Sequence, residues 1–154
     1  MMKQLCEHVL EVLKGKTLAT AESCTGGGIG AAITSVSGSS SVYKGGIISY
    51  QNEVKRDLLG VSEYDLRTYG PVSSFVAEQM AAGARKALQV DVAVSVTGLA
   101  GPGGDDYGNP VGTVYIGYSD EMVSFARKFH FCGNREEVRK QAIENAFQII
   151  LEKN

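Results

Sequence analysis

The sequence contains no tryptophan, only two histidines and three prolines, and three cysteines. Two histidines make both a zinc site of the Cys/His type and a Ser-His-Asp triad poor candidates. The cysteines Cys6, Cys24 and Cys132 lie far apart and form no CxxC pair. Such a sparse, odd set is typical of reduced thiols in the cytosol. We therefore expect no metal site, no cofactor and a cytoplasmic location.

Basic residues are not in excess either: Lys and Arg number 15, Asp and Glu number 17, and the net charge is −2. Proteins that bind duplex nucleic acid usually carry a basic surplus, so we expect no nucleic-acid partner. The opening MMKQLCEHVL is interrupted by Glu7 and His8, which is typical of neither a signal peptide nor a membrane span. With 154 residues, 44% of them hydrophobic, we expect one folded domain over residues 1–154 and no membrane partner.

Glycine is the residue present in excess, with 19 among 154 positions. The glycines gather at 26–28, 45–46 and 98–108 rather than at a fixed period. Glycine allows the backbone to approach a ligand closely, so these clusters indicate candidate binding loops.

Apolar periodicity predicts helices that alternate with short strands. The helices are expected at 2–14, from 28 to about 36, at 52–59, at 75–88 and at 135–152, with a short capping motif at Ser62 and Asp65. The strands are expected at 17–21, 44–50, 91–96, 111–118 and 122–131. The alternation favours an α/β fold, a three-layer α/β/α sandwich. The consecutive late strands favour a mixed sheet.

The loop after the first strand, with Ser23, Thr25, Gly26 and Gly27, is a first candidate site. A strand, a glycine-rich turn and a helix N-terminus together offer free N–H groups and hydroxyls to a phosphate. The loop has neither a GK[ST] ending nor a GxGxxG pattern. A tight turn with glycines needed for packing is an equally good interpretation, and in either case we interpret Cys24 as a packing thiol.

A second candidate combines Gly38, Ser39 and Ser40 with Tyr50 and Lys55. A serine becomes a nucleophile only beside a base, and a desolvated lysine amine can be that base. A tyrosine hydroxyl could relay or orient the proton. The alternative is a polar surface loop beside a solvated lysine, which the bare residues favour.

A third candidate is the loop at 97–104, just beyond a buried strand. Ligands of open α/β sheets bind outside the carboxyl ends of strands, which favours a functional loop. At the start of the last helix, Arg135 and Arg139 could each bind a phosphate or carboxylate in a bidentate manner. Surface pairing with neighbouring glutamates is the simpler interpretation of both arginines. Asp105 and Asp106 are better explained by the glycine-rich turn than by a metal.

Several motifs occur together in order: AESCTGG, GSS followed by YKGGIISY, the lysine of NEVK, GPVS, SVTGLAGPGG and PVGTVYIG. Over residues 18–139 they resemble the CinA C-terminal domain family, whose members are nicotinamide-nucleotide amidases, also called NMN deamidases. The resemblance implies hydrolysis of nicotinamide mononucleotide (NMN) to nicotinate mononucleotide and ammonia, in pyridine-nucleotide recycling. It also implies a stand-alone form of a domain that follows another one in longer relatives.

The resemblance carries active-site roles to particular positions. The family's active-site positions match Ser23, Ser40, Tyr50, Lys55, Thr97 and Arg135, and we expect the first five to be catalytic. We expect substrate to be bound by Arg135 and by the loops, at Thr25, Gly26, Gly27, Gly38, Ser39, Gly45, Gly98, Gly101 and Gly103. Our leading hypothesis is a metal-independent mechanism in which Ser40 attacks the amide, with Lys55 as base and Tyr50 as relay. Thr97, Ser23 and backbone N–H groups would stabilise the oxyanion or hold substrate. Ser23 as nucleophile and a directly activated water are the alternatives.

Other functions remain open at this point. A nucleotide-binding regulatory module would keep the glycine loops and use the serines and the lysine for binding alone. A DNA-associated competence protein is disfavoured by the acidic balance. A small domain with long loops and apolar helices also favours self-association, so we expect a homodimer or a higher homo-oligomer.

Overall fold

A five-stranded sheet in the order β2-β1-β3-β4-β5 forms the centre of the computed structural model, which describes residues 1–154. The strands are β1 (Leu18–Glu22), β2 (Tyr43–Ile48), β3 (Val92–Gly98), β4 (Thr113–Ser119) and β5 (Ser124–His130). β1 pairs in parallel with both β2 and β3, whereas β4 runs antiparallel to β3 and β5. The predicted mixed sheet is therefore confirmed.

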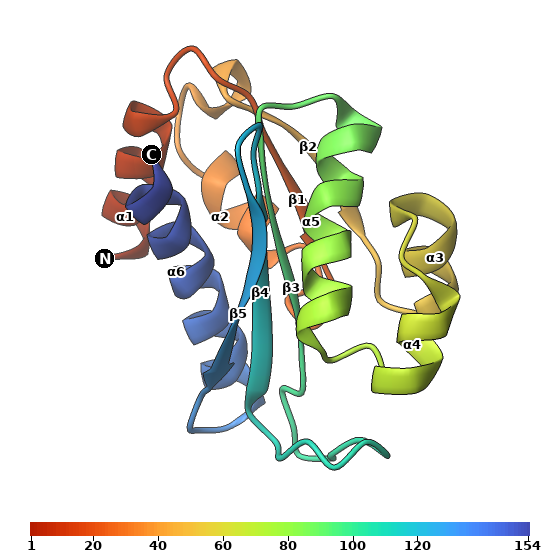
Figure 1. Ribbon diagram of the computed structural model, residues 1–154. Helices are drawn as coiled ribbons and strands as arrows, with labels where there is room; N and C mark the ends of the chain where they lie inside the picture. The colour runs from red at the N-terminus through yellow and green to blue at the C-terminus, as the bar shows by residue number, and fades with distance from the viewer.

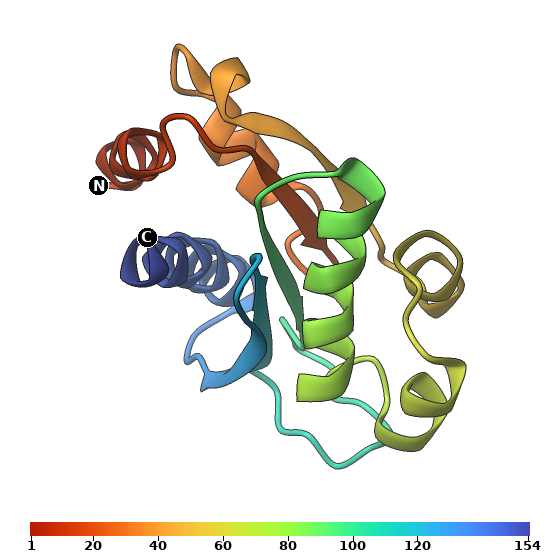
Figure 2. The same cartoon turned by 45° about the horizontal axis from the view of Figure 1, so that its top comes forward.

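Helices cover both faces of this sheet, as Figures 1 and 2 show. On one face lie α1 (Met2–Val12), α2 (Gly28–Thr34) and α6 (Arg135–Lys153), and on the other lie α3 (Asn52–Leu59), α4 (Glu63–Tyr69) and α5 (Ser74–Leu88). Each face has its own apolar core, with Phe147 of α6 in one and Met80 of α5 in the other. The predicted three-layer α/β/α sandwich is confirmed. None of its helices is both long and apolar enough to cross a membrane.

Close packing of α5 on the sheet depends on a glycine in β4. A Cβ atom at Gly117 would overlap the carbonyl oxygen of Ala77 in α5, so only glycine lets the helix lie this near the strand. The hydroxyl of Ser95 in β3 donates to the same carbonyl at 2.6 Å. β3 and β4 are thus fixed beneath α5, which also fixes the loop that joins them.

The predicted element boundaries are mostly correct to within two residues. Ser62 accepts from the N–H of Asp65 at the start of α4, as its capping motif predicted, and Ser73 accepts from the N–H of Val76 at the start of α5. The sequence did not predict the 3-10 helix η1 (Ser39–Ser41). The strand expected to reach residue 50 ends at Ile48. This earlier end matters because the next two residues turn toward the candidate site.

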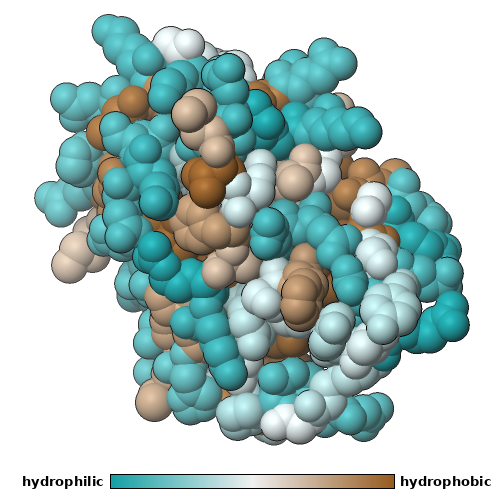
Figure 3. Space-filling model, in the orientation of Figure 1, coloured by the Kyte–Doolittle hydropathy of each residue, from teal (hydrophilic) through white to brown (hydrophobic).

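The carboxyl ends of β1, β2 and β3 lie at one edge of the sheet, at its lower end in Figure 1. The long loop between β3 and β4 and the first turn of α6 lie at the same edge. In the space-filling view most of this side of the molecule is hydrophilic, and the lower edge is pale, neither strongly hydrophilic nor hydrophobic (Figure 3). η1 precedes β2 and therefore lies at the opposite end of the sheet.

Candidate active site

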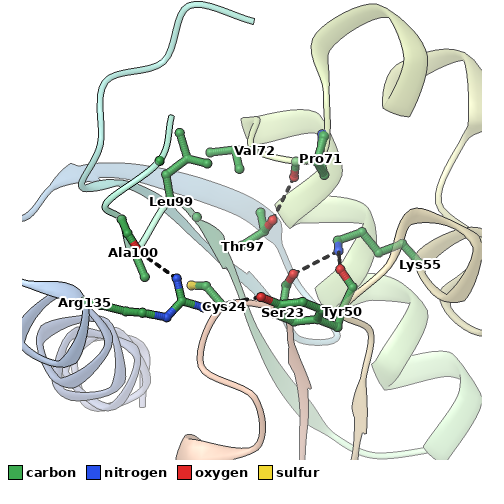
Figure 4. A pocket seen from close by; sticks show the side chains of 13 residues that line it. Ser23, Cys24, Tyr50, Lys55, Pro71, Val72, Thr97, Leu99, Ala100 and Arg135 are labelled. Atoms are coloured by element: carbon green, nitrogen blue, oxygen red, sulfur yellow. Dashed lines mark hydrogen bonds between the residues drawn. The ribbon is translucent and has the colours of Figure 1, made fainter. Parts of the chain in front are cut away.

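A cleft of about 210 Å³ opens at the carboxyl ends of the strands. Its walls are the turn after β1, Tyr50 after the end of β2, Lys55 of α3, the segment of Pro71 and Val72 before α5, the loop after β3 and the start of α6. The side chains that converge on it are those of Ser23, Cys24, Tyr50, Lys55, Thr97 and Arg135 (Figure 4). Cationic side chains line this cleft and no carboxylate does, although the whole chain is slightly acidic.

Lys55 is the best-buried charged residue of the cleft. Its side chain extends from α3 and is 1% exposed. The Nζ atom lies 2.9 Å from the Ser23 hydroxyl, 2.6 Å from the carbonyl oxygen of Ser49 and 3.1 Å from that of Tyr50. The early end of β2 places both carbonyls here. The structure thus brings together the amine and one of the two serines that the sequence offered as nucleophile.

Burial lowers the pKa of the Lys55 amine from 10.5 to about 8, because the charged form loses its hydration and no carboxylate replaces it. The Cys24 thiol raises this pKa by a smaller effect. A substantial share of the amine is therefore neutral at slightly alkaline pH. Lysines with lowered pKa values act as general bases in hydrolases.

The three contacts of Nζ give the neutral amine a defined orientation. An ammonium group has three N–H donors, whereas a neutral amine has two donors and one lone pair. The carbonyls of Ser49 and Tyr50 accept the two remaining N–H bonds, which directs the lone pair at the hydroxyl of Ser23. In this form Ser23 donates to Lys55, which is the arrangement of a serine nucleophile and its base.

The turn that follows Ser23 offers backbone donors. The N–H groups of Cys24 and Thr25 lie outside every helix and strand, and neither makes a hydrogen bond within the chain. Cys24 itself lines the cleft, and burial raises the pKa of its thiol to about 11 despite the opposing effects of its own backbone N–H and of the nearby cations Arg139, Lys55 and Arg135. The thiol is therefore protonated, in agreement with its interpretation as a packing group.

The turn after β1 does not bind an anion at the helix N-terminus as the sequence suggested. Glu22, 2% exposed, accepts from the N–H groups of Ile29 and Gly30 at 2.8 and 3.0 Å, so its carboxylate already occupies that position. The Thr25 hydroxyl also donates to Glu22, at 2.7 Å. Thr25, Gly26 and Gly27 lie outside the cleft walls, and Gly27 has a φ of 100° at the N-cap of α2. Their glycine-rich sequence is explained by the turn.

The sequence predicted that Ser40 lies beside Lys55. Within this chain the structure separates the two residues. Parallel pairing of β1 with β2 puts η1 at the amino end of β2, whereas Lys55 follows its carboxyl end. The six residues of β2 span about 20 Å at about 3.3 Å per residue. The other residues predicted to bind substrate from this segment, Gly38, Ser39 and Gly45, are likewise absent from the cleft.

The loop after β3 lies at the cleft, as predicted, but the hydroxyl of Thr97 does not have its predicted role. Gly98, Gly101 and Gly103 line the cleft. Thr97 is 1% exposed, and its hydroxyl donates to the carbonyl oxygen of Pro71 at 2.8 Å. Because that proton is already used, Thr97 joins two walls of the cleft and is not a free donor for an oxyanion.

Arg135 and Tyr50 stand at the mouth of the cleft. The guanidinium of Arg135 donates to the carbonyl oxygen of Gly101 at 2.8 Å and to the Tyr50 hydroxyl at 3.4 Å. A capping box of Asn134 and Glu137 fixes the helix turn that carries Arg135. Tyr50 lines the cleft and is 60% exposed, and its carbonyl oxygen accepts a hydrogen bond from Lys55.

Sequence reasoning missed several residues that build the site. Glu22 accepts from the N–H groups of Ile29 and Gly30, and the carbonyl of Ser49 accepts from Lys55. Arg139 was named as a candidate for a phosphate or a surface glutamate, and its contact with the carbonyl oxygens of Cys24 and Thr25 was not predicted. Glu22 offered one signal, since an acidic residue at the end of an otherwise apolar strand needs a buried partner. The other two contacts leave no trace in the sequence, because any residue supplies a carbonyl. No three His, Cys, Asp or Glu side chains gather where they could hold a metal ion.

Comparison with known proteins gives a consistent picture. A family model described as the CinA C-terminal domain matches residues 2–153. The nicotinamide-nucleotide amidohydrolase PncC of Escherichia coli is 42% identical over 152 residues, which cover 97% of this chain and 92% of that protein. A CinA-like protein of Rippkaea orientalis is 52% identical over 129 residues. That match covers 82% of this chain but 31% of the relative, so the chain spans about a third of the length of such relatives.

Solved structures agree with the fold over the whole chain. A CinA superfamily protein from Escherichia coli superposes with a TM-score of 0.97 at 31% identity, covering 100% of this chain and 91% of the other. The competence/damage inducible protein CihA from Agrobacterium tumefaciens gives a TM-score of 0.94 at 35% identity, covering 98% and 94%. The α/β fold and the motif resemblance thus agree with each other.

Proposed function

Because the chain belongs to the CinA C-terminal domain family, we propose that it is an amidohydrolase that converts nicotinamide mononucleotide to nicotinate mononucleotide and ammonia. The 42% identity to a protein named nicotinamide-nucleotide amidohydrolase, over nearly the full length of both, supports this substrate. The observation that carries the proposal is the buried contact of 2.9 Å between Lys55 Nζ and Ser23 Oγ.

In the proposed reaction the Ser23 oxygen attacks the carboxamide carbon, and its proton passes to neutral Lys55. The carbonyl oxygen becomes an oxyanion, and we assign its stabilisation to the N–H group of Cys24, which donates to no oxygen within the chain. When the intermediate collapses, the carbon–nitrogen bond breaks, and the Lys55 ammonium gives its proton to the nitrogen, which leaves as ammonia. Water then attacks the acyl group on Ser23 with Lys55 again as base, and nicotinate and the free serine are formed.

The charge of the cleft supports a phosphorylated substrate. Arg135 and Lys55 line it without any carboxylate, and Arg139 lies beside its floor. Such a cleft concentrates anions, because uncompensated cations attract them over several ångströms. Arg135 stands at the exposed mouth, where the 5′-phosphate is expected, while the pyridine carboxamide enters toward Ser23.

The proposal predicts ammonia release from the purified chain supplied with NMN, with nicotinate mononucleotide formed in equal amount. Since the proposed chemistry uses only side chains and backbone, EDTA is expected to leave the rate unchanged. Enzymatic ammonia detection and chromatography of the product measure both. Calorimetric binding of NMN without ammonia release would instead indicate a nucleotide-binding regulatory module, and loss of activity in EDTA would contradict the mechanism.

Replacing Arg135 with alanine is expected to weaken binding rather than chemistry. Removing one charge-assisted contact to phosphate should raise KM for NMN about 10-fold and change kcat little. Nicotinamide riboside, which has no phosphate, serves as the control substrate, and its KM should respond far less. A fall in kcat at constant KM would show that Arg135 acts on the reacting amide instead.

A further inference from the structure

We infer that Arg139 is a positioning residue, which acts from α6 through the backbone of the turn that carries Ser23. This inference rests on the proposed function, in which the N–H group of Cys24, directly after Ser23, stabilises the oxyanion. Its physical basis is a pair of hydrogen bonds between segments more than a hundred residues apart, with Nε to the carbonyl oxygen of Cys24 at 3.0 Å and Nη2 to that of Thr25 at 3.1 Å.

The guanidinium of Arg139 is committed to these carbonyls. Arginines in this chain that form ion pairs are Arg56, Arg67 and Arg127, and no carboxylate lies within ion-pair distance of Arg139. The side chain is also half-buried, so water replaces these contacts poorly. Arg139 is therefore not free to bind a phosphate, and its charge is directed at two consecutive peptide groups.

The carbonyls of Ser23, Cys24 and Thr25 each have a donor. Ser23 accepts from the N–H of Gly26 at 3.0 Å, Cys24 from Arg139, and Thr25 from both Arg139 and the N–H of Gly28 at 2.9 Å. The N–H groups of Cys24 and Thr25 have no acceptor. In a planar trans peptide the N–H points opposite to the carbonyl. By holding the Cys24 carbonyl, Arg139 therefore fixes the plane of the peptide between Cys24 and Thr25, which adjoins the N–H of Cys24.

Loss of Arg139 should loosen this arrangement without unfolding the turn. Glu22 still holds the Thr25 hydroxyl and the first N–H groups of α2. The peptide between Cys24 and Thr25, however, loses its only partner and becomes free to rotate. Rotation of this peptide would also displace Cys24, whose N–H group is the proposed oxyanion donor at the cleft, and this destabilises the transition state more than the bound substrate.

The test is the Arg139→Ala variant, measured with NMN beside Arg127→Ala as matched control. Arg127 is an arginine of β5 whose guanidinium pairs with Glu152 at 2.8 Å. We expect kcat to fall about 10- to 100-fold for Arg139→Ala, with KM and the pH midpoint unchanged, and no change for Arg127→Ala. Guanidinium chloride at millimolar concentration should restore part of the lost kcat, whereas sodium chloride should not. Arg139→Lys keeps one donor group, so its kcat should lie between those of the wild type and of Arg139→Ala. It replaces the alanine variant if that variant does not fold.

The possible results separate this inference from the proposed function. Unchanged kcat in Arg139→Ala, or a raised KM at constant kcat, overturns the positioning role while the amidase stands. If the wild-type chain releases no ammonia, the proposed amidase function is refuted. The role of Arg139 is then tested by the rate at which phenylmethanesulfonyl fluoride labels Ser23, measured by mass spectrometry. Slower labelling in Arg139→Ala than in Arg127→Ala then supports the positioning role, and equal labelling, or none in the wild type, overturns it.

Discussion

Replacing Ser23 with alanine is expected to reduce kcat for NMN about 10⁴-fold or more, because loss of a nucleophile removes the covalent route altogether. The lost oxygen is the one that lies 2.9 Å from Lys55 Nζ. Binding should change little, since one hydroxyl is removed from a cleft with many other contacts. Steady-state ammonia release gives kcat, and calorimetry with NMN confirms that the variant still binds.

Ser40→Ala is the matched control, since it removes the same atom from the serine at the far end of the sheet. Ser40 is exposed and outside the cleft, so its variant should keep kcat within about twofold of the wild type. The reverse outcome, an active Ser23→Ala and an inactive Ser40→Ala, would refute the assignment. It would mean that Ser40 reaches the lysine of a second copy of the chain.

Replacing Lys55 with methionine is expected to abolish turnover by about 10³-fold or more, because no other base lies beside Ser23. The variant should nevertheless remain folded. Burial of the wild-type ammonium lowers its pKa from 10.5 to about 8, which costs on the order of 3 kcal/mol at neutral pH. Methionine removes this cost, which offsets the loss of the hydrogen bonds to the carbonyl oxygens of Ser49 and Tyr50. Urea unfolding should show at least wild-type stability, and a clearly unstable variant would contradict the account.

The same lysine sets the sign of the pH dependence. Only the neutral amine accepts the Ser23 proton, so the wild-type kcat/KM should rise about tenfold per pH unit below a midpoint near the pKa of about 8. Above that pH the rate should level off. Folding stability should rise with pH between about 8 and 10.5, since the unfolded lysine binds a proton there and the folded one does not. A rate that falls with rising pH through 8 would exclude Lys55 as base.

The fold was predictable from the sequence because its signals are local. The five strands and the helices follow from apolar periodicity and from caps such as Ser62 and Ser73, and the mixed sheet follows from the hairpin of β4 and β5. Strand order was not predictable in the same way. Parallel pairing of β1 with both β2 and β3 depends on contacts between distant segments, and periodicity carries no information about them.

The candidate site was predictable in its residue types but not in its geometry. Motif resemblance pointed to Ser23, Ser40 and Lys55 together, yet spacing along the chain cannot tell which serine meets the amine. That choice depends on strand direction. Ser23 and Lys55 follow the carboxyl ends of β1 and β2, whereas Ser40 precedes β2, so the length of one strand separates the two serines. The glycine-rich turn misled for a related reason. Glu22 fills the helix N-terminus that a free turn would have offered to phosphate.

The protonated thiol of Cys24 has a consequence for the chemistry of oxidation. With its pKa raised to about 11, only about one thiol in ten thousand is a thiolate at neutral pH, and the thiolate is the nucleophile that attacks peroxides and disulfides. The residue next to the proposed nucleophile is thus a sulfur atom kept unreactive by its surroundings. Oxidants in the cell would meet the exposed Cys132 first. The proposed amidase should therefore keep its activity when peroxide is present.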